Sequence, residues 1–189
     1  MALAFALVLG TPHLMTSSAD VNAELLSNPG LELPGPDGGP ASWVDSSWGD
    51  NTHTASWLTG DAHSGEHSVN VEVSAHATGD AKWAPDDDSL VAVTGGAHYT
   101  FSDWYRSDTT TAVSVYYERA DGVGSWANLF AGIAPATAWT QYSTAFTMPA
   151  DAVKAYFVHF IARNGFLQTD DSSMQQADAP PGFGRPMIS

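Results

Sequence analysis

Ser68–Val73 reads SVNVEV and Ala112–Glu118 reads AVSVYYE, and these two stretches decide the fold class. In both, apolar side chains alternate with polar ones, which is the two-residue period of a β-strand with one buried face. Val69, Val71 and Val73 would therefore share the buried face of the first strand. A helical period is hard to find anywhere after residue 20, so the sequence favours an all-β domain.

Further segments of strand character follow along the chain, and turn residues separate them. Short runs of Gly, Asp, Asn and Pro mark tight turns, because these residues accept the backbone angles that turns require. Several short strands punctuated in this way predict a two-sheet antiparallel β-sandwich over residues 20–178. The strand segments are Leu90–Val93, Tyr99–Tyr105, Gln141–Phe146 and Val153–Ala162, and the turns are Pro36–Gly39, Thr94–Gly96, Ala120–Gly122 and Arg163–Gly165.

The composition limits the possible partners. The 189 residues are 43% hydrophobic and include seven Trp, six Tyr and eight Phe, an aromatic content typical of a folded domain. Asp and Glu number 21 against six Lys and Arg, which gives a formal charge of −15. Such a chain would be repelled by a phosphate backbone and by anionic lipid, so we expect neither a nucleic acid nor a membrane as partner.

The two ends of the chain differ from its middle. Residues 1–19 begin with the apolar run MALAFALVL and reach Ser17-Ser18-Ala19, a small-residue sequence that suits cleavage. We interpret them as a truncated signal peptide of a secreted protein, or alternatively as an N-terminal arm. Residues 179–189 are rich in Pro and Gly and are interpreted as a linker or the start of a following domain. The domain would then be a monomeric module within a larger chain.

Five segments together resemble one known family. In order they are ELLSNPGLE at Glu24–Glu32, SGEHSV at Ser64–Val69, VTGGAHYTFS at Val93–Ser102, the Trp139–Pro149 stretch with Phe146, and TDD at Thr169–Asp171. Over residues 24–174 the chain is similar to the jelly-roll carbohydrate-binding modules of xylanases and glucanases. It departs from their pattern at Leu31, Thr94 and the polar flanks of Asp170-Asp171. The resemblance implies a jelly roll that binds a polysaccharide or oligosaccharide.

A narrower resemblance concerns the protein around the module. The segments WGDNT, GDAKW and FSDWYRS, together with RPMIS at the end of the chain, look like modules that precede bacterial polysaccharide deacetylase domains. This likeness implies a non-catalytic module that keeps a tethered enzyme near its substrate, with the catalytic residues outside this chain. The alternative is a structural or adhesive sandwich that packs against a neighbouring domain without binding sugar.

The resemblance also implies a structural Ca²⁺ ion. Its ligands would be Glu32 near the start of the domain and Asp170 with Asp171 near its end. Hard cations take oxygen ligands, and strands from the two ends of a jelly roll can lie side by side. The alternative is a solvated acidic turn.

Aromatic residues are the candidates for sugar contact, because the apolar C–H faces of a pyranose stack on flat rings. Trp48, Trp57, Trp83, Tyr105 and Trp126 are the candidate platforms, and each could instead be a core or rim residue. Asn51, Asp80, Lys82 and Arg106 are the candidate polar partners. Asp80 and Lys82 would share one face of an extended segment.

Signs of catalysis are weak. His63 and His67 are four residues apart, as in some zinc sites, but Gly65 and the strand that follows disfavour the helix which that spacing needs. The sequence contains no G-x-S-x-G, Walker or Rossmann signature. We therefore expect a binding module and not an enzyme.

Overall fold

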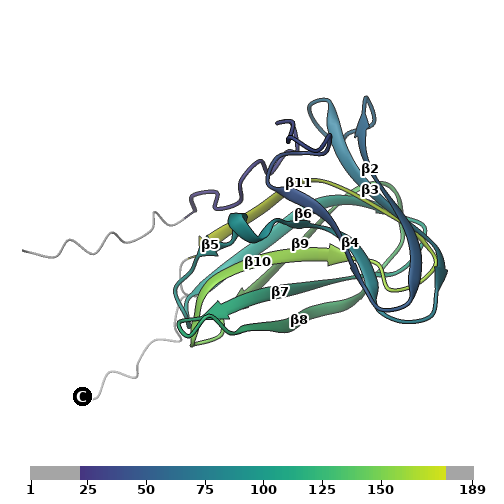
Figure 1. Ribbon diagram of the computed structural model, residues 1–189. Helices are drawn as coiled ribbons and strands as arrows, with labels where there is room; N and C mark the ends of the chain where they lie inside the picture. The colour runs from purple at the N-terminus through teal and green to yellow at the C-terminus, as the bar shows by residue number, and fades with distance from the viewer. Residues whose placement is uncertain (1–21, 178–189) are drawn as a thin grey trace, which may run out of the picture.

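The two alternating stretches become β3 (His67–His76) and β7 (Thr111–Arg119), one in each layer of a β-sandwich (Figure 1). The computed structural model describes residues 22–177. The predicted signal peptide at 1–19 and the linker at 179–189 lie outside these residues. Within them, no helix is long and apolar enough to cross a membrane.

One layer is a five-stranded antiparallel sheet in the order β2-β3-β11-β6-β9. Its strands, apart from β3, are β2 (Asn51–Thr59), β11 (Gly165–Ala177), β6 (His98–Ser107) and β9 (Ala136–Thr147). The last strand, β11, lies between β3 and β6, so the sheet joins the beginning, middle and end of the domain. We call it the back layer.

The front layer contains the sheet β5-β10-β7-β8 and the strand pair β1–β4. Its elements, apart from β7, are β5 (Val91–Ala92), β10 (Ala152–Phe160), β8 (Gly124–Ile133), β1 (Trp43–Trp48), β4 (Asp80–Pro85) and a 3₁₀ turn at Asp87–Ser89. Ala81 and Ile161 exchange two backbone hydrogen bonds of 2.9 and 3.0 Å, which attach β4 beside the end of β10. The predicted all-β, two-sheet antiparallel jelly roll is confirmed.

The core lies between the layers and is built by the alternation seen in the sequence. Val69, Val71 and Val73 of β3 are at most 2% exposed, and Val113 and Val115 of β7 face them fully buried. Each such side chain stabilises the fold by about 1.5–3 kcal/mol through burial.

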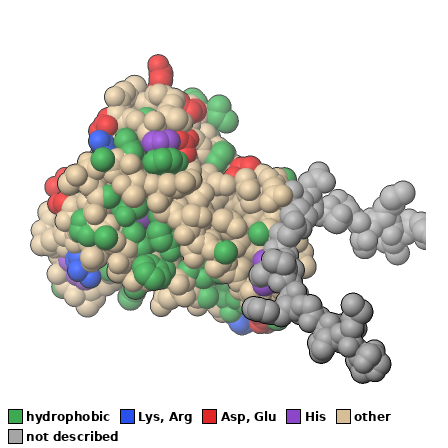
Figure 2. Space-filling view, turned by 180° about the vertical axis from the view of Figure 1, so that it is seen from behind, with side chains coloured by type: hydrophobic (Ala, Val, Ile, Leu, Met, Phe, Trp, Pro, Cys, Tyr) green, Lys and Arg blue, Asp and Glu red, His purple; other side chains and the backbone are tan. Residues whose placement is uncertain are grey.

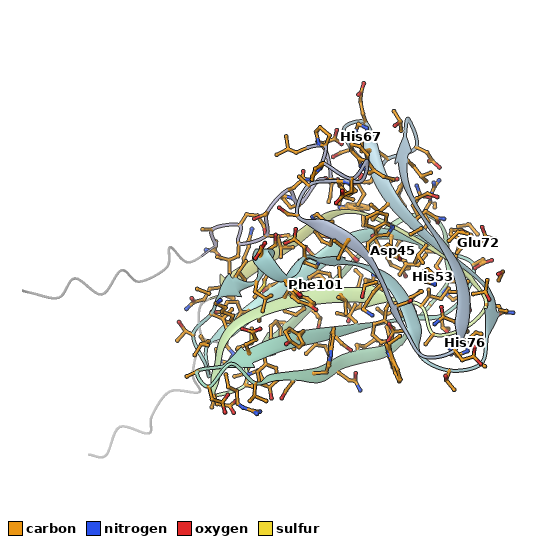
Figure 3. The ribbon with its side chains drawn as sticks, in the orientation of Figure 1. Asp45, His53, His67, Glu72, His76 and Phe101 are labelled. Atoms are coloured by element: carbon orange, nitrogen blue, oxygen red, sulfur yellow. The ribbon has the colours of Figure 1, made fainter. Side chains whose placement is uncertain are left out.

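Aromatic rings complete the contact between the layers. Phe101 of β6, labelled in Figure 3, is buried and stacks on Phe157 of β10 with ring centroids 4.9 Å apart. Phe146 of β9 meets the same Phe157 ring edge-on, also at 4.9 Å. Phe157 therefore anchors the front layer to two strands of the back layer.

A polar group sits inside this core. His159 Nδ1 lies 2.7 Å from Asp103 Oδ2, and His159 Nε2 lies 2.7 Å from the hydroxyl oxygen of Thr111. All three residues are buried, and they come from β10, β6 and β7. Because buried polar groups require partners, this chain of hydrogen bonds fixes the two layers in one register.

Candidate functional site

The outer face of the front layer carries a second, smaller apolar cluster. Along β10, Ala155, Phe157 and His159 face the core, so the alternate residues Tyr156 and Val158 point outward. Tyr156 stacks on Tyr116 of β7 at 5.1 Å between ring centroids. Burial of Tyr156, together with the negative charge of Asp87, raises the pKa of its phenol to about 12. The face is aromatic, and the Tyr156 hydroxyl stays protonated.

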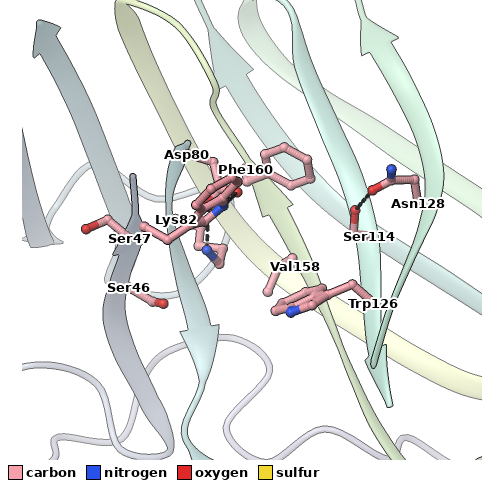
Figure 4. Close-up of a pocket in the computed structure, with 10 residues that line it drawn as sticks. Ser46, Ser47, Asp80, Lys82, Ser114, Trp126, Asn128, Val158 and Phe160 are labelled. Carbon is pink, nitrogen blue, oxygen red and sulfur yellow. Dashed lines mark hydrogen bonds and ion pairs between the residues drawn. The ribbon is translucent and has the colours of Figure 1, made fainter. Parts of the chain in front are cut away.

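A cleft of about 460 Å³ opens on this outer face (Figure 4). Figure 4 shows Trp126 beside Val158, with Asp80 and Lys82 projecting from the neighbouring strand β4. Trp48 is 64% exposed and Trp126 is 51% exposed, an unusual state for so large an apolar side chain. The lining residues are Ser46, Ser47, Trp48, Asp80, Lys82, Ser114, Trp126, Asn128, Val158 and Phe160.

Polar groups in the cleft hold one another in place. The Lys82 ammonium lies 2.5 Å from Asp80 Oδ1, and Trp48 Nε1 donates to Asp80 Oδ2 at 2.5 Å. Lys82 Nζ also lies 5.9 Å from the centre of the Trp126 ring. Asp80 thus neutralises a buried ammonium and orients an exposed indole, so the cleft has a preformed shape.

Two glycines place Trp48 at the rim of the cleft. Gly49 and Gly79 have φ values of 83° and 85°, a region that suits glycine. A Cβ atom on Gly79 would lie 1.8 Å from the carbonyl oxygen of Trp48. The turn after β1 and the turn before β4 can therefore approach this closely only with glycine at these two positions. Their contact fixes where β1 ends.

The structure brings four of the nine predicted ligand-binding residues into this cleft: Trp48, Asp80, Lys82 and Trp126. Asp80 and Lys82 share one face of β4, as their spacing predicts. Asn51 does not line the cleft but holds its rim, because its side-chain amide donates to the Trp48 carbonyl oxygen at 3.0 Å.

The other four predicted residues lie elsewhere. Trp57 Nε1 donates to the Leu31 carbonyl at 3.0 Å and Trp83 Nε1 to the Asn70 carbonyl at 3.1 Å; both rings pack against the core. Tyr105 is 5% exposed, within the core. Arg106 is bound to Asp61 and Gln168 and lies over the Trp139 ring, outside the cleft.

Sequence reasoning missed the floor and far wall of the cleft. Val158 and Phe160 belong to the run AYFVHF, which is apolar at nearly every position and so reads as buried on both faces. Ser114 and Asn128, joined by a 2.9 Å hydrogen bond, carry no motif. The alternation of Ser114 with Val113 and Val115 predicts that the Ser114 side chain points away from the core, but no local feature of the sequence indicates an open cleft there.

The three predicted metal ligands gather around the loop before β3. Glu32 Oε1 accepts hydrogen bonds from the backbone N–H groups of Glu66 and His67. Asp170 Oδ2 accepts from those of His63 and Ser64. Asp171 contacts the same loop, since its Oδ2 lies 2.6 Å from His63 Nδ1. The acids therefore tie the start and end of the domain to one loop.

The ionisation of these acids differs. Burial raises the pKa of Asp170 to about 6, and the neighbouring Asp171 charge adds to the shift despite backbone hydrogen bonds that oppose it. Burial also acts to raise the pKa of Glu32, but the hydrogen bonds from His67 and Glu66 hold it below its ordinary value. Among residues 22–177, Asp170 is thus a buried acid with no Lys or Arg ion-paired to it.

The chemistry of this set fits a hard cation only in part. Carboxylate oxygens are suitable ligands, and a cation would relieve the cost of burying the Asp170 charge. Several lone pairs are already used by backbone N–H groups, however, and among residues 22–177 no three acidic, His or Cys side chains are grouped as a metal site requires. The calcium ion stays a prediction.

Comparison with known proteins agrees with the fold. A family model described as a carbohydrate binding domain matches residues 24–165. No curated protein matches the chain.

Among solved structures, the chain is similar to a xylan-binding domain from Paenibacillus barcinonensis Xyn10C. The two share 13% identity with a TM-score of 0.57, over 86% of this chain and 100% of that one. A C-terminal family 22 module of Clostridium thermocellum Xyn10B gives 17% identity and a TM-score of 0.52, over 82% and 98%.

The enzymatically active domain of a bacteriophage CBA120 tailspike gives 15% identity and a TM-score of 0.59, over 81% of this chain. This chain spans only 21% of the tailspike chain. At these identities the structural matches show a shared fold.

Proposed function

The chain belongs to the carbohydrate-binding domain family, and from this premise we propose that the outer cleft of the front layer binds a polysaccharide chain. The sugar rings would lie between Trp48 at one rim and Trp126 at the other. The observation that carries the proposal is the exposure of these two indoles, 64% and 51%, beside an aromatic floor in a preformed cleft. Folded domains expose large apolar rings to water mainly at sites that a partner covers when it binds.

The cleft offers both kinds of contact that a sugar uses. Indole rings accept the apolar C–H faces of pyranoses, while Asp80, Ser114 and Asn128 can exchange hydrogen bonds with hydroxyl groups. One platform that covers about 60 Å² contributes roughly 1.5 kcal/mol. Two or three platforms give about 3–4.5 kcal/mol before ordering costs, so we expect Kd values near millimolar for short oligosaccharides.

The context of the module forms part of the proposal. A secreted module of this kind would hold a tethered, deacetylase-like enzyme near polysaccharide by raising its effective concentration. The chemistry would then lie outside this chain. The alternative, a scaffolding sandwich that binds no sugar, requires Trp48 and Trp126 to be covered by a neighbouring domain.

We also propose that Glu32 and Asp170 hold a structural Ca²⁺, with Asp171 beside them. The buried, raised-pKa carboxylate of Asp170 supports this, because a cation would stabilise its charged form. A ligand bound only by the folded state raises Tm, so EDTA should lower it and added Ca²⁺ should restore it. If neither EDTA nor Ca²⁺ changes the Tm of the parent or of Asp170→Ala, the site is refuted.

Affinity electrophoresis of the domain in gels that contain xylan, β-glucan, chitin or acetylated polysaccharide tests the main proposal. The parent should be retarded by at least one polymer, and the double variant Trp48→Ala/Trp126→Ala should migrate freely while unfolding at the same temperature within a few degrees. If no polymer retards the parent, the scaffolding alternative replaces the binding function.

A further inference from the structure

A second pocket of about 220 Å³ lies beside the cleft at one end of the front layer. Asn128 and Phe160 line both hollows, so the two are adjacent on the same face of the sheet. The pocket lies where β10 ends, β7 begins and β8 ends. Its lining residues are Thr110, Thr111, Ala112, Asn128, Phe130, Ala131, Gly132, Phe160, Ala162 and Arg163.

The pocket differs from the cleft in its charge. Arg163 is the one ionisable residue that lines it, and its side chain is exposed. Within residues 22–177, Lys82, Arg106 and Arg119 pair with carboxylates, whereas Arg163 has no ion pair. The carboxylate of Asp108, beside Gly165, accepts a hydrogen bond from the Phe166 N–H at 2.8 Å. Lys154 is also unpaired among the described residues, but Arg163 is the cation that lines this pocket, on a chain of net charge −15.

A hydroxyl group in the same pocket also lacks a partner. Thr110 Oγ1 is buried and makes no hydrogen bond with any described residue. Buried polar atoms nearly always have a partner, so the Thr110 hydroxyl keeps an unused capacity for one hydrogen bond. Phe160 and the half-exposed Phe130 supply an apolar wall beside it.

From these features we infer that the second pocket binds a sugar that carries a carboxylate, a uronosyl residue of the polysaccharide held in the cleft. Arg163 receives the carboxylate, the Thr110 hydroxyl completes a hydrogen bond, and Phe160 packs against the ring. This inference rests on the proposed function and specifies its substrate class.

The carboxylate follows from electrostatics. A planar guanidinium forms paired hydrogen bonds with a carboxylate, and these are stronger than bonds to neutral hydroxyls. The net charge of −15 makes the domain as a whole repel anions, and on the face seen in Figure 2 acidic side chains and a few basic ones are scattered over a mostly uncharged surface. A local cation at the end of the cleft offsets that repulsion for an acidic sugar, and a neutral sugar would gain little from it.

Matched polymers and matched variants test the inference. Glucuronoxylan, homogalacturonan and alginate are each compared with the same polymer after carboxyl reduction, at about 0.15 M salt so that distant charges are screened. At least one acidic polymer should bind about 1.5- to 5-fold more tightly than its reduced form, the range for one exposed charge pair. Arg163→Gln should abolish that difference and leave binding of the reduced polymer unchanged.

Lys154→Gln is the control, because Lys154 is exposed, forms no ion pair with any residue that the structure describes and lies toward the opposite end of β10. It removes the same charge and should keep the preference. The carboxylate site would be overturned if both variants lost the preference for acidic polymers equally. It would also be overturned if dextran sulfate gave the same gain in affinity as the carboxylated polymers. Tight binding of the reduced polymers without any gain from carboxylates would overturn the subsite alone. If the parent binds none of the polymers, the proposed function and this inference are overturned together.

Discussion

The two faces of β10 show how one strand serves two purposes. Toward the core it presents Phe157, 2% exposed and stacked against Phe101 of the opposite sheet. Toward the outside it presents Tyr156 and Val158, which are also shielded, but by side chains of their own layer. The inner face is closed by a second sheet, whereas the outer face ends in a cleft.

This difference separates stability from binding. A side chain on the inner face is surrounded on all sides, so its removal leaves a cavity. A side chain that borders the cleft has solvent or ligand on one side, so its removal changes affinity more than folding. Substitutions on the two faces should therefore have opposite effects.

The largest effect is expected at Phe157. Phe157→Ala should lower the free energy of unfolding by about 3–5 kcal/mol, because it empties a packed site between the layers. Phe160→Ala, three residues along, should cost no more than about 1.5 kcal/mol and weaken polysaccharide binding. Urea denaturation and affinity electrophoresis measure the two quantities. A similar stability loss in both variants would contradict the separation of the faces.

The polar group inside the core comes next. Asp103→Ala should cost about 3 kcal/mol, because it leaves His159 buried without one of its partners. The double variant Asp103→Leu/His159→Leu should recover much of that loss, since apolar groups need no partner. Chemical denaturation gives both values, and a larger loss in the double variant would show that the pair itself is strongly stabilising.

A pair of tryptophans sharpens the comparison. Trp48→Ala should weaken sugar binding about 10-fold, which corresponds to roughly 1.5 kcal/mol of lost platform, and leave Tm nearly unchanged. Trp57→Ala should do the reverse, with about 2 kcal/mol of lost stability and unchanged affinity, because its ring packs on the core. Isothermal titration and thermal melts distinguish these outcomes. Reduced affinity in stably folded Trp57→Ala would place this tryptophan at the binding site.

The smallest effect concerns the acidic loop contact, which belongs to neither face. With EDTA present, lowering the pH from 7 to 5 should stabilise the domain by about 1 kcal/mol through Asp170, whose folded-state pKa of about 6 exceeds the unfolded value of 3.8. The folded state then binds a proton that the unfolded state does not. With bound Ca²⁺ the trend should reverse, since protons compete with the cation. Asp170→Asn provides the control that removes both trends in denaturation curves.

The sequence by itself determined the fold class. The period-two runs at Ser68–Val73 and Ala112–Glu118 predicted which valines are buried, because a strand sends successive side chains to opposite faces. The family segments predicted a carbohydrate-binding family, whose model matches residues 24–165, and the spacing of Asp80 and Lys82 gave them a common face. The periodic runs and the residue spacing are local in the sequence, and the family segments follow one another in a fixed order, so all of these features can be predicted from the sequence alone.

Only the tertiary structure decided which aromatic residues face solvent. Trp48 lies among Ser, Gly and Asn, a setting that favours exposure, but the sequence does not separate Trp57 from it as a sugar platform. In the structure, carbonyl oxygens of distant segments accept the indole N–H groups of Trp57 and Trp83, whereas Trp48 lies at an open rim. The cleft depends on β4 docking beside β10 through Ala81 and Ile161, eighty positions apart. Long-range strand pairing of this kind leaves no periodic trace in the sequence, because each strand has the same pattern whichever neighbour it pairs with.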